Sequence, residues 1–409
     1  MRSGSLWRHG DFRLLGIGQG VSALGTWVSS TALQVMAIVT LGAGPLEMGV
    51  LAVCSSAGIL VVGPIAGAWV DRLHRRPVMI ATDIGRAAIL ATIPLAALLG
   101  VLRIELLYIA ALGTASLSSF FEAAYRSYPP VLVPRGRLAD ANGSLAAVSS
   151  AAEITGPPLG GALVQLLSAP IAVALDALSF VISAVSLAFI GARESKDAAA
   201  PPREPILREI AQGIAFLARE PSLRVIALSG VASALFGNFY GALYMLYGLD
   251  ELGLSPVLVG ITVAAGGVGS LVAAPLAGRA ARRWGIGPAL IGGRLAAAVL
   301  GFLMPLAAGP TAFLFLLIPQ LIGDGLATIS IVNAVTLRQL LSPSYMLGRV
   351  NATLHVLAFG VGPLGALMGA AIAEAYGIRA AIWVATVGIF AGTLVLFLPS
   401  PLLRMREVR

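Results

Sequence analysis

Residues 48–76 read MGVLAVCSSAGILVVGPIAGAWVDRLHRR, and this stretch decides the fold. Residues 48–70 carry no charged side chain, whereas residues 71–76 hold one aspartate and three arginines. An uncharged run of about 20 residues is long enough, as a helix, to cross the hydrocarbon core of a bilayer. Arginines gathered directly after such a run are typical of a cytoplasmic loop. The stretch therefore predicts a transmembrane helix that ends on the cytoplasmic side.

The composition of the whole chain agrees with a protein that crosses the membrane many times. Of its 409 residues, 58% are hydrophobic and only 11% are charged, whereas soluble domains carry about 25% charged residues. This composition excludes a water-soluble enzyme and a disordered chain. The single cysteine, Cys54, excludes a disulfide within the chain, and the three scattered histidines predict no metal site. We expect no cofactor, and no catalytic motif points to an enzyme.

Further uncharged runs predict an all-α polytopic membrane protein with twelve transmembrane helices. We interpret the first run as a retained helix rather than a cleaved signal peptide, because it is longer than the apolar core of a signal. The predicted spans are 14–40, 46–70, 77–101, 105–127, 142–167, 170–192, 222–249, 254–280, 287–308, 311–337, 348–373 and 379–400.

The placement of the basic residues predicts the orientation of these spans. With the N-terminus inside, the cytoplasmic segments hold 23 of the 27 Lys and Arg residues, and the outer loops hold only Arg103 and Arg379. This asymmetry predicts that both termini are cytoplasmic. It also accounts for the net charge of +8, so that no binding to nucleic acid is expected.

Landmarks of the first half recur in the second half at a nearly constant offset. The glycine that opens GAWVDRLHRR at residue 67 corresponds to the glycine that opens GRAARRWG at residue 278, which is 211 positions later. Three more pairs follow at offsets of 208 or 209, namely Pro134 and Pro343, Asn142 and Asn351, and Arg86 and Arg294. A parallel repeat of this kind predicts two six-helix halves, as in transporters that bind substrate at the interface between repeats.

The repeat sets the predicted domain boundaries. We predict an N-terminal half at 1–192, a cytoplasmic linker at 193–221, and a C-terminal half with a short tail at 222–409. Within the linker, residues 206–219 place apolar side chains at helical spacing among charges. This pattern predicts a short amphipathic helix on the cytoplasmic membrane surface, with a cytoplasmic start of the seventh span as the alternative.

Residues 67–76 resemble the G-x-x-x-D-R-x-x-R-R signature loop of the major facilitator superfamily, and the resemblance covers nearly the whole chain. The antiporter motif of that family's fifth helix is matched by Gly143, Gly156, Pro157, Gly160 and Gly161, with Ala152 where a glycine is usual. The stretches 83–86, 138–144, 176–180 and 347–351 are similar to the branch of macrolide and siderophore exporters. The resemblance implies a transporter that works by alternating access.

In that family the signature loop latches the two halves in the outward-facing state. The residues that would form the latch here are Gly67, Asp71, Arg72, Arg75 and Arg76, with the eleventh span as partner. The alternative is that the arginines only hold the loop inside. The second copy has Arg282 in place of Asp71, so an acid-dependent latch is expected in the first copy alone.

Two further pairs of opposite charge lie inside the predicted spans. Asp83 and Arg86 are three residues apart, and Glu122 and Arg126 are four apart, so each pair shares one helix face. We expect all four to form a gating network with the signature loop, and Arg294 to be the counterpart of Arg86. The fourth span lacks the mid-membrane arginine of many proton-driven exporters, so coupling through such an arginine is not predicted.

The matched antiporter motif predicts a bend and a tight helix contact. Pro157 removes a backbone hydrogen bond, and Gly156, Gly160 and Gly161 allow a neighbouring helix to approach closely. The resemblance associates this feature with exporters, whereas ordinary packing of small residues is the alternative.

Acidic side chains inside spans are costly and mark function by default. In the fold that the resemblance implies, the tenth span lines the cavity, so Asp324 is the first candidate to carry a proton or attract a cationic substrate. Glu153 is the second candidate. The alternative is a buried acid that is simply satisfied by hydrogen bonds, which is our interpretation of Asp176.

Polar and aromatic residues on the lining spans predict an amphipathic pocket. Its candidate residues are Asn238, Tyr240, Tyr244 and Tyr247 on the seventh span, with Trp27, Gln34, Phe120 and Gln320 on others. The alternatives are the outer aromatic belt for Tyr247 and plain packing for Phe120.

The sequence thus predicts a secondary transporter that exports amphipathic small molecules, drug-, macrolide- or siderophore-like, by alternating access and proton antiport. The expected partners are a small-molecule substrate, protons and the lipid bilayer of a bacterial inner membrane, and we expect a monomer. Uptake or a lipid-like substrate by the same fold, and a non-transporting receptor or assembly factor, are the alternatives.

Overall fold

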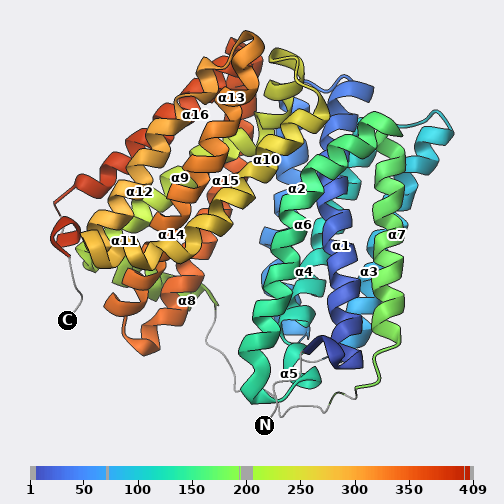
Figure 1. The fold of residues 1–409 in the computed structure, drawn as a ribbon, viewed down its shortest axis with the longest axis horizontal. Coiled ribbons are helices and arrows are strands. Elements are labelled where there is room, and N and C mark those ends of the chain that lie inside the picture. Colours follow the sequence, from blue (N-terminus) through green and yellow to red (C-terminus); the bar gives the residue numbers. More distant parts are fainter. Residues whose placement is uncertain (1–5, 71–72, 193, 195–205, 400, 406–409) are drawn as a thin grey trace. The chain divides into compact units, whose positions relative to one another are not determined.

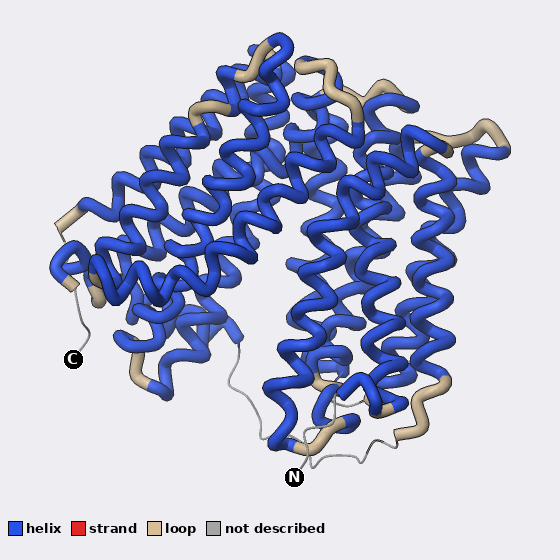
Figure 2. The backbone as a smooth tube through the Cα atoms, in the orientation of Figure 1, coloured by secondary structure: helices blue, strands red, loops and turns tan. Residues whose placement is uncertain are grey.

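The computed structural model describes residues 6–70, 73–192, 194, 206–399 and 401–405. Every regular element in this part of the chain is a helix, and Figure 1 follows the helices from the first to the last. Figure 2 shows no strand in the described ranges. Asp71, Arg72 and residues 193 and 195–205 of the predicted linker lie outside the described residues.

The described residues form two compact units. The first lies within Met1–Ala43, Val53–Pro201 and Ser255–Gly260, and the second lies within Gly44–Ala52, Pro202–Leu254 and Ile261–Arg409. Two short segments are exceptions to the chain order, because 44–52 belongs to the second unit and 255–260 to the first. The predicted domain boundaries at 192 and 222 stay a prediction.

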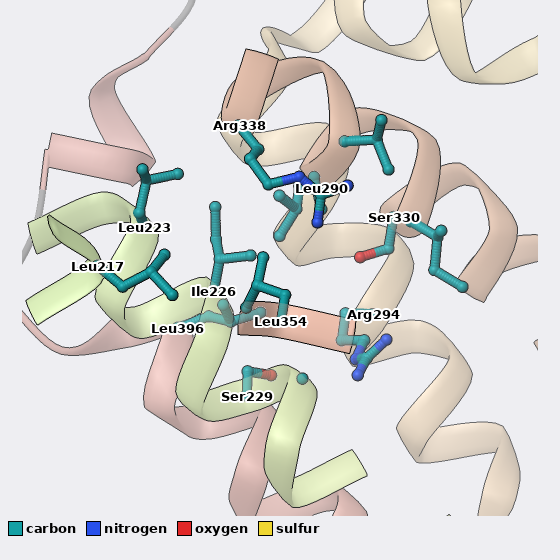
Figure 3. Close-up of a pocket in the computed structure, with 14 residues that line it drawn as sticks. Leu217, Leu223, Ile226, Ser229, Leu290, Arg294, Ser330, Arg338, Leu354 and Leu396 are labelled. Carbon is teal, nitrogen blue, oxygen red and sulfur yellow. The ribbon is translucent and has the colours of Figure 1, made fainter. Parts of the chain in front are cut away.

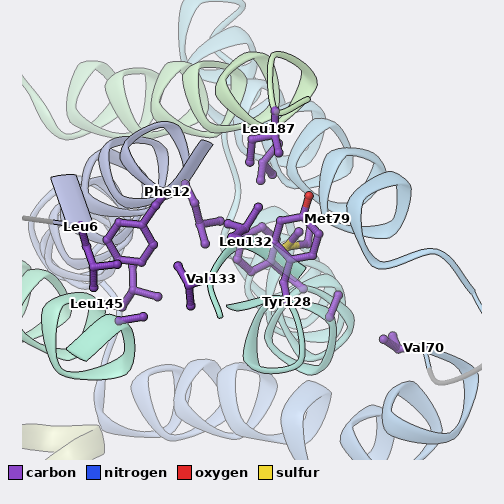
Figure 4. Close-up of a cluster of buried hydrophobic side chains, with 14 residues drawn as sticks. Leu6, Phe12, Val70, Met79, Tyr128, Leu132, Val133, Leu145 and Leu187 are labelled. Atoms are coloured by element: carbon purple, nitrogen blue, oxygen red, sulfur yellow. The ribbon is translucent and has the colours of Figure 1, made fainter. Parts of the chain in front are cut away.

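The first unit is built around α1, which packs along α6 and α7, while α3 packs along α4 and α7. Buried apolar side chains from several helix ends form one cluster, in which Phe12, Met79 and Leu187 take part (Figure 4). The helices of this part of the chain are α1 (Gly10–Val35), α2 (Pro45–Val70), α3 (Arg75–Leu98), α4 (Ile104–Arg126), α5 (Pro129–Leu132), α6 (Leu138–Leu166) and α7 (Ala169–Ala188).

In the second unit, α9 packs along α15 and α16, and α12 packs along α14. The helices of this part are α8 (Ile206–Arg219), α9 (Pro221–Leu246), α10 (Pro256–Ala273), α11 (Ala277–Trp284), α12 (Ile286–Gly301), α13 (Ala312–Ile318), α14 (Asp324–Leu341), α15 (Ser344–Tyr376) and α16 (Ile378–Leu394).

The predicted amphipathic helix corresponds to α8, which is separate from α9. Glu220 interrupts the helix and Pro221 begins the next one, as expected because proline is favoured in a first turn. α8 packs along α15, and Gly213 makes this possible because a Cβ there would overlap Thr353 Oγ1. The position of α8 on a membrane surface stays a prediction.

The described part of the chain contains three π-helical turns at helix ends or between helices. Met36–Thr40 follows α1, Tyr247–Glu251 follows α9, and Pro319–Gly323 joins α13 to α14. The sequence did not predict them, because the apolar residues of a span indicate that it is helical but not whether its backbone hydrogen bonds are of the α or the π type.

Eleven of the described helical segments are long and apolar enough to cross a membrane. The prediction of an all-helical polytopic membrane protein is confirmed, but the count of twelve spans is not. The missing span is the predicted 142–167, which lies in the 29-residue helix α6. Throughout α6, Glu153, three serines and the prolines and glycines interrupt the apolar residues, so no 18-residue stretch of it is as apolar as the other spans. The orientation of the termini stays a prediction.

Candidate functional site

The arginines that follow α2 are bound within the first unit. The backbone amides of Arg75 and Arg76 donate to the carboxylate of Glu194 at 2.8 and 2.7 Å, so this acid caps the start of α3. The Arg76 side chain donates to the carbonyls of Leu187 and Ala188 at the end of α7, where a cation is favoured by the helix dipole. Arg75 and Arg76 thus attach the start of α3 to Glu194 and to the end of α7.

Glu194 was missed by the sequence analysis, because an acid after the sixth span gives no sign of which helix it caps. Tyr128 lies near it and is fully buried. Burial, together with the carboxylate of Glu194, raises the pKa of Tyr128 to about 12, so its phenol is neutral at physiological pH.

Gly67, the first residue of the signature loop, lies in α2, and a Cβ there would meet no atom within 4 Å.

Asp83 and Arg86 form a buried ion pair on α3. Their side chains are 0% and 6% exposed, and the guanidinium also donates to Ser118 Oγ on α4 at 3.3 Å. The rings of Phe121 and Phe180 flank the guanidinium at 4.4 and 4.2 Å from their centroids. A buried charge needs such compensation on every side.

Asp176 on α7 completes this cluster. It is 1% exposed, accepts a hydrogen bond from Ser179 Oγ at 2.8 Å, and interacts electrostatically with Arg86. α1 approaches the acid at Gly25, where a Cβ would overlap the carboxylate. The stretches 83–86 and 176–180 therefore meet in space, which their sequence spacing alone does not reveal.

Glu122 and Arg126 form a second pair, which is more exposed than the first. Their side chains are 47% and 80% exposed, and Arg126 Nε donates to Glu122 Oε2 at 3.1 Å. Among the described residues no ion pair joins them to Asp83 or Arg86, but Glu122 interacts electrostatically with Arg86. The predicted gating network of these four residues with the signature loop stays a prediction, because Asp71 lies outside the described residues.

The motif glycines of α6 lie against α1. A Cβ on Gly156 would overlap Trp27, and a Cβ on Gly160 would lie 3.0 Å from the carbonyl oxygen of Val28. Pro157 and Gly161 are also buried, and Gly161 lies against the backbone of Pro256 in the same unit. These small residues let two helix backbones approach more closely than larger side chains would allow.

The other first-unit candidates are not gathered into one site. Glu153 is exposed on α6, while Trp27 and Gln34 on α1 are partly buried. Phe120 packs against the apolar cluster of Figure 4, which agrees with the packing alternative.

Asp324 is the first residue of α14, directly after the π-helical turn Pro319–Gly323. Its carboxylate faces α10 at Gly266, where a Cβ would overlap Asp324 Oδ2 and lie 3.4 Å from Gln320 Oε1. Gln320 also hydrogen-bonds Tyr244, whose hydroxyl donates to Thr262 Oγ1 at 2.8 Å. We call Tyr244, Thr262, Gln320 and Asp324 the polar cluster.

The polar cluster brings together Asp324, the first candidate for a coupling acid, and two residues of the predicted pocket, Tyr244 and Gln320. Among the described residues no ion pair involves Asp324, although it is partly buried. Gly266 and Thr262 were missed, because a glycine and a threonine on an apolar helix resemble ordinary packing residues. The signal for Gly266 was the run AAGGVGS at 264–270, whose small side chains leave room beside the helix. No signal in the sequence pointed to Thr262.

The remaining tyrosines of α9 bond to different partners. Tyr240 shares a hydrogen bond with Thr386 on α16, and the fully buried Tyr247 donates to the carbonyl of Met304 at 3.0 Å. Asn238 donates to the carbonyl of Ala234 and packs against the glycines of α15. The candidate pocket residues of the seventh span therefore take part in several different helix contacts, and the burial of Tyr247 argues against a place in the outer aromatic belt.

The known proteins that this chain resembles are membrane transporters. A family model described as Major Facilitator Superfamily matches residues 15–362. The multidrug efflux pump Tap of Mycolicibacterium fortuitum is 30% identical over 382 residues, covering 89% of this chain and 88% of that protein. Macrolide efflux protein A of Streptococcus pyogenes is 27% identical over 274 residues, covering 65% of this chain and 66% of that protein. A crystal structure of the nucleoside transporter NupG aligns with a TM-score of 0.73 at 14% identity, covering 98% of this chain and all of that one, which shows the shared fold alone.

Proposed function

Because this chain belongs to the major facilitator superfamily, a family of transporters and not of enzymes, we propose that it exports amphipathic small molecules by alternating access in exchange for protons. The names of the relatives, a multidrug efflux pump and a macrolide efflux protein, support export and a drug-like substrate class. The energy comes from the proton gradient.

The observation that carries the proposal is the polar cluster around Asp324. This acid has polar neighbours but no described cationic partner, so a proton or a cationic substrate can neutralise it. Competition between the two for one carboxylate gives antiport directly, because binding of one requires release of the other. Gln320 and Tyr244 supply hydrogen bonds that orient either occupant.

The proposed topology follows from charge. We propose that α6 is the twelfth span, and that both termini face the cytoplasm of a bacterium whose inner membrane holds the protein as a monomer. The excess of Arg in the inner loops supports this orientation. The signature loop, with Gly67 and Asp71, is proposed to latch the outward-facing state, and the contact between α6 and α1 to seal the first unit against leak.

The test is accumulation of a macrolide and of a fluorescent cationic dye in an efflux-deficient bacterial host. Cells with the wild-type protein are expected to accumulate less than cells with an empty vector, and a protonophore should abolish the difference. Asp324→Asn should abolish it too. The matched control is Asp250→Asn, which removes an exposed carboxylate from the same unit and should leave export unchanged.

Two results would contradict the proposal. Export that survives both Asp324→Asn and the protonophore would remove proton coupling through this acid. Export lost in Glu153→Gln but retained in Asp324→Asn would move the coupling site to α6. Membrane expression of each variant is measured in parallel, so that loss of protein is not mistaken for loss of transport.

A further inference from the structure

The second unit contains a cavity of about 160 Å³ among α8, α9, α12, α14 and α15. In the view of Figure 3, Arg294 and Arg338 lie on one side, from α12 and α14. The apolar side chains of Leu217, Leu223 and Ile226, from α8 and α9, lie on the other. The cavity thus combines a cationic wall with an apolar wall, and it is separate from the polar cluster around Asp324.

The two arginines have no described compensating charge. No carboxylate lines the cavity among the described residues, and no ion pair in this part of the chain involves either guanidinium. Arg338 Nε is buried and lacks a hydrogen-bond partner. Both arginine side chains are partly buried, and a partly buried charge without a partner is costly, so an anionic ligand at this place would stabilise the protein.

The internal repeat shows which negative charges the second half lacks beside Arg294. Arg86, the first-half counterpart of Arg294, is neutralised by Asp83 three residues earlier. The position 208 residues after Asp83 is Ile291, and the residues that follow Asp176 by 208 to 211 positions read VATV, at 384–387. At these repeat positions the second half has the arginine but neither of the two acids.

We propose that this cavity binds the anionic headgroup of an amphiphile, a phosphate or carboxylate that carries an acyl chain. Arg294 and Arg338 neutralise the headgroup, Ser229 and Ser330 offer hydroxyl groups, and Leu217 and Leu223 cover the first methylenes of the chain. The volume equals about five water molecules in the liquid, which fits a headgroup and a short chain segment but not a whole phospholipid. The site takes an anion, whereas the proposed export site around Asp324 takes a cation.

The experiment measures binding to the purified full-length protein in a neutral detergent, so it does not depend on transport. Dioleoylphosphatidylglycerol and dodecyl phosphate are the anionic probes, and dioleoylphosphatidylcholine is the zwitterionic control. Native mass spectrometry counts bound molecules, and the unfolding temperature reports stabilisation by ligand. Both anionic probes, or one of them, should bind and stabilise. Preference for the phospholipid identifies a bilayer lipid, and preference for dodecyl phosphate identifies a single-chain amphiphile.

Three variants test the assignment. Arg294→Gln with Arg338→Gln should weaken binding at least about tenfold. Arg279→Gln with Arg282→Gln, which removes two exposed charges of the same unit, should leave binding unchanged. Ile291→Asp restores the spacing of the first-half pair, and should keep the protein folded while it displaces the anionic probe. Equal binding by wild type and by the first variant, or no preference for anionic over zwitterionic probe, would overturn the proposal.

Discussion

Replacing Arg86 by methionine is expected to destabilise the first unit more than removal of any other single charge in it. The change keeps an unbranched apolar stem but leaves Asp83, which is fully buried, without its cation. It also removes the hydrogen bond to Ser118 and the stacking on Phe121 and Phe180. Removing one partner of a buried ion pair costs about 3–5 kcal/mol, because the remaining charge stays out of water.

The matched control lies on the neighbouring helix. Glu122→Gln breaks a pair of the same charge type whose side chains are 47% and 80% exposed. An exposed pair at this spacing contributes only about 0.3–0.5 kcal/mol. Burial, rather than charge pairing as such, therefore accounts for the expected difference.

The assay is reversible unfolding of the purified protein in mixed micelles, followed by circular dichroism. Arg86→Met should lower the free energy of unfolding by several kcal/mol, and the double variant Arg86→Met with Asp83→Leu should recover part of the loss, because no unpaired charge remains on α3. The reasoning is refuted if Arg86→Met unfolds within about 1 kcal/mol of Glu122→Gln, or if the double variant is less stable than the single one.

Three further outcomes are expected. Gly156→Ala should lose about 1–3 kcal/mol of unfolding free energy by overpacking against α1, whereas Gly143→Ala on the same helix, with no atom within 4 Å, should gain about 0.5–1 kcal/mol; equal shifts would contradict the close contact. Glu194→Ala should cost about 1–2 kcal/mol in the same assay, because the first amides of α3 lose their cap; an unchanged stability would show that water replaces the carboxylate. Gly266→Ala should reduce export in the accumulation assay, because its Cβ displaces the carboxylate of Asp324; full export would mean that the orientation of this acid is unimportant.

Much of the helix layout was predictable from the sequence. The predicted span 105–127 corresponds to α4 (Ile104–Arg126), because charged residues at both ends bound an apolar run. At α6 the same reasoning predicted a span despite its polar residues, and α6 is not among the eleven described segments that are long and apolar enough to cross a membrane. Hydropathy describes one segment at a time, and by hydropathy alone α6 is not recognised as a span. Only the repeat of two six-helix halves indicates that α6 crosses the membrane.

The candidate site was predictable in its residue types but not in its contacts. Asp324, Gln320 and Tyr244 were each selected as polar residues on spans expected to line a cavity, and they lie together. Asp176 was interpreted as a satisfied acid, and it does accept a hydrogen bond from Ser179, but its proximity to Arg86 depends on how α3 packs against α7. Such tertiary partners leave no periodic signal in a single sequence.

Two of the π-helical turns follow the internal repeat. Tyr247–Glu251 follows Met36–Thr40 by 211 positions, the same offset that separates the two glycines at 67 and 278. π-helical turns are rare, so this agreement extends the repeat from the sequence to the backbone hydrogen-bond pattern. Each of the two turns is the last turn of its helix, and it therefore fixes where the chain leaves that helix. The two segments, MAIVT and YGLDE, have no residue in common, so the shared backbone geometry does not depend on a shared local sequence.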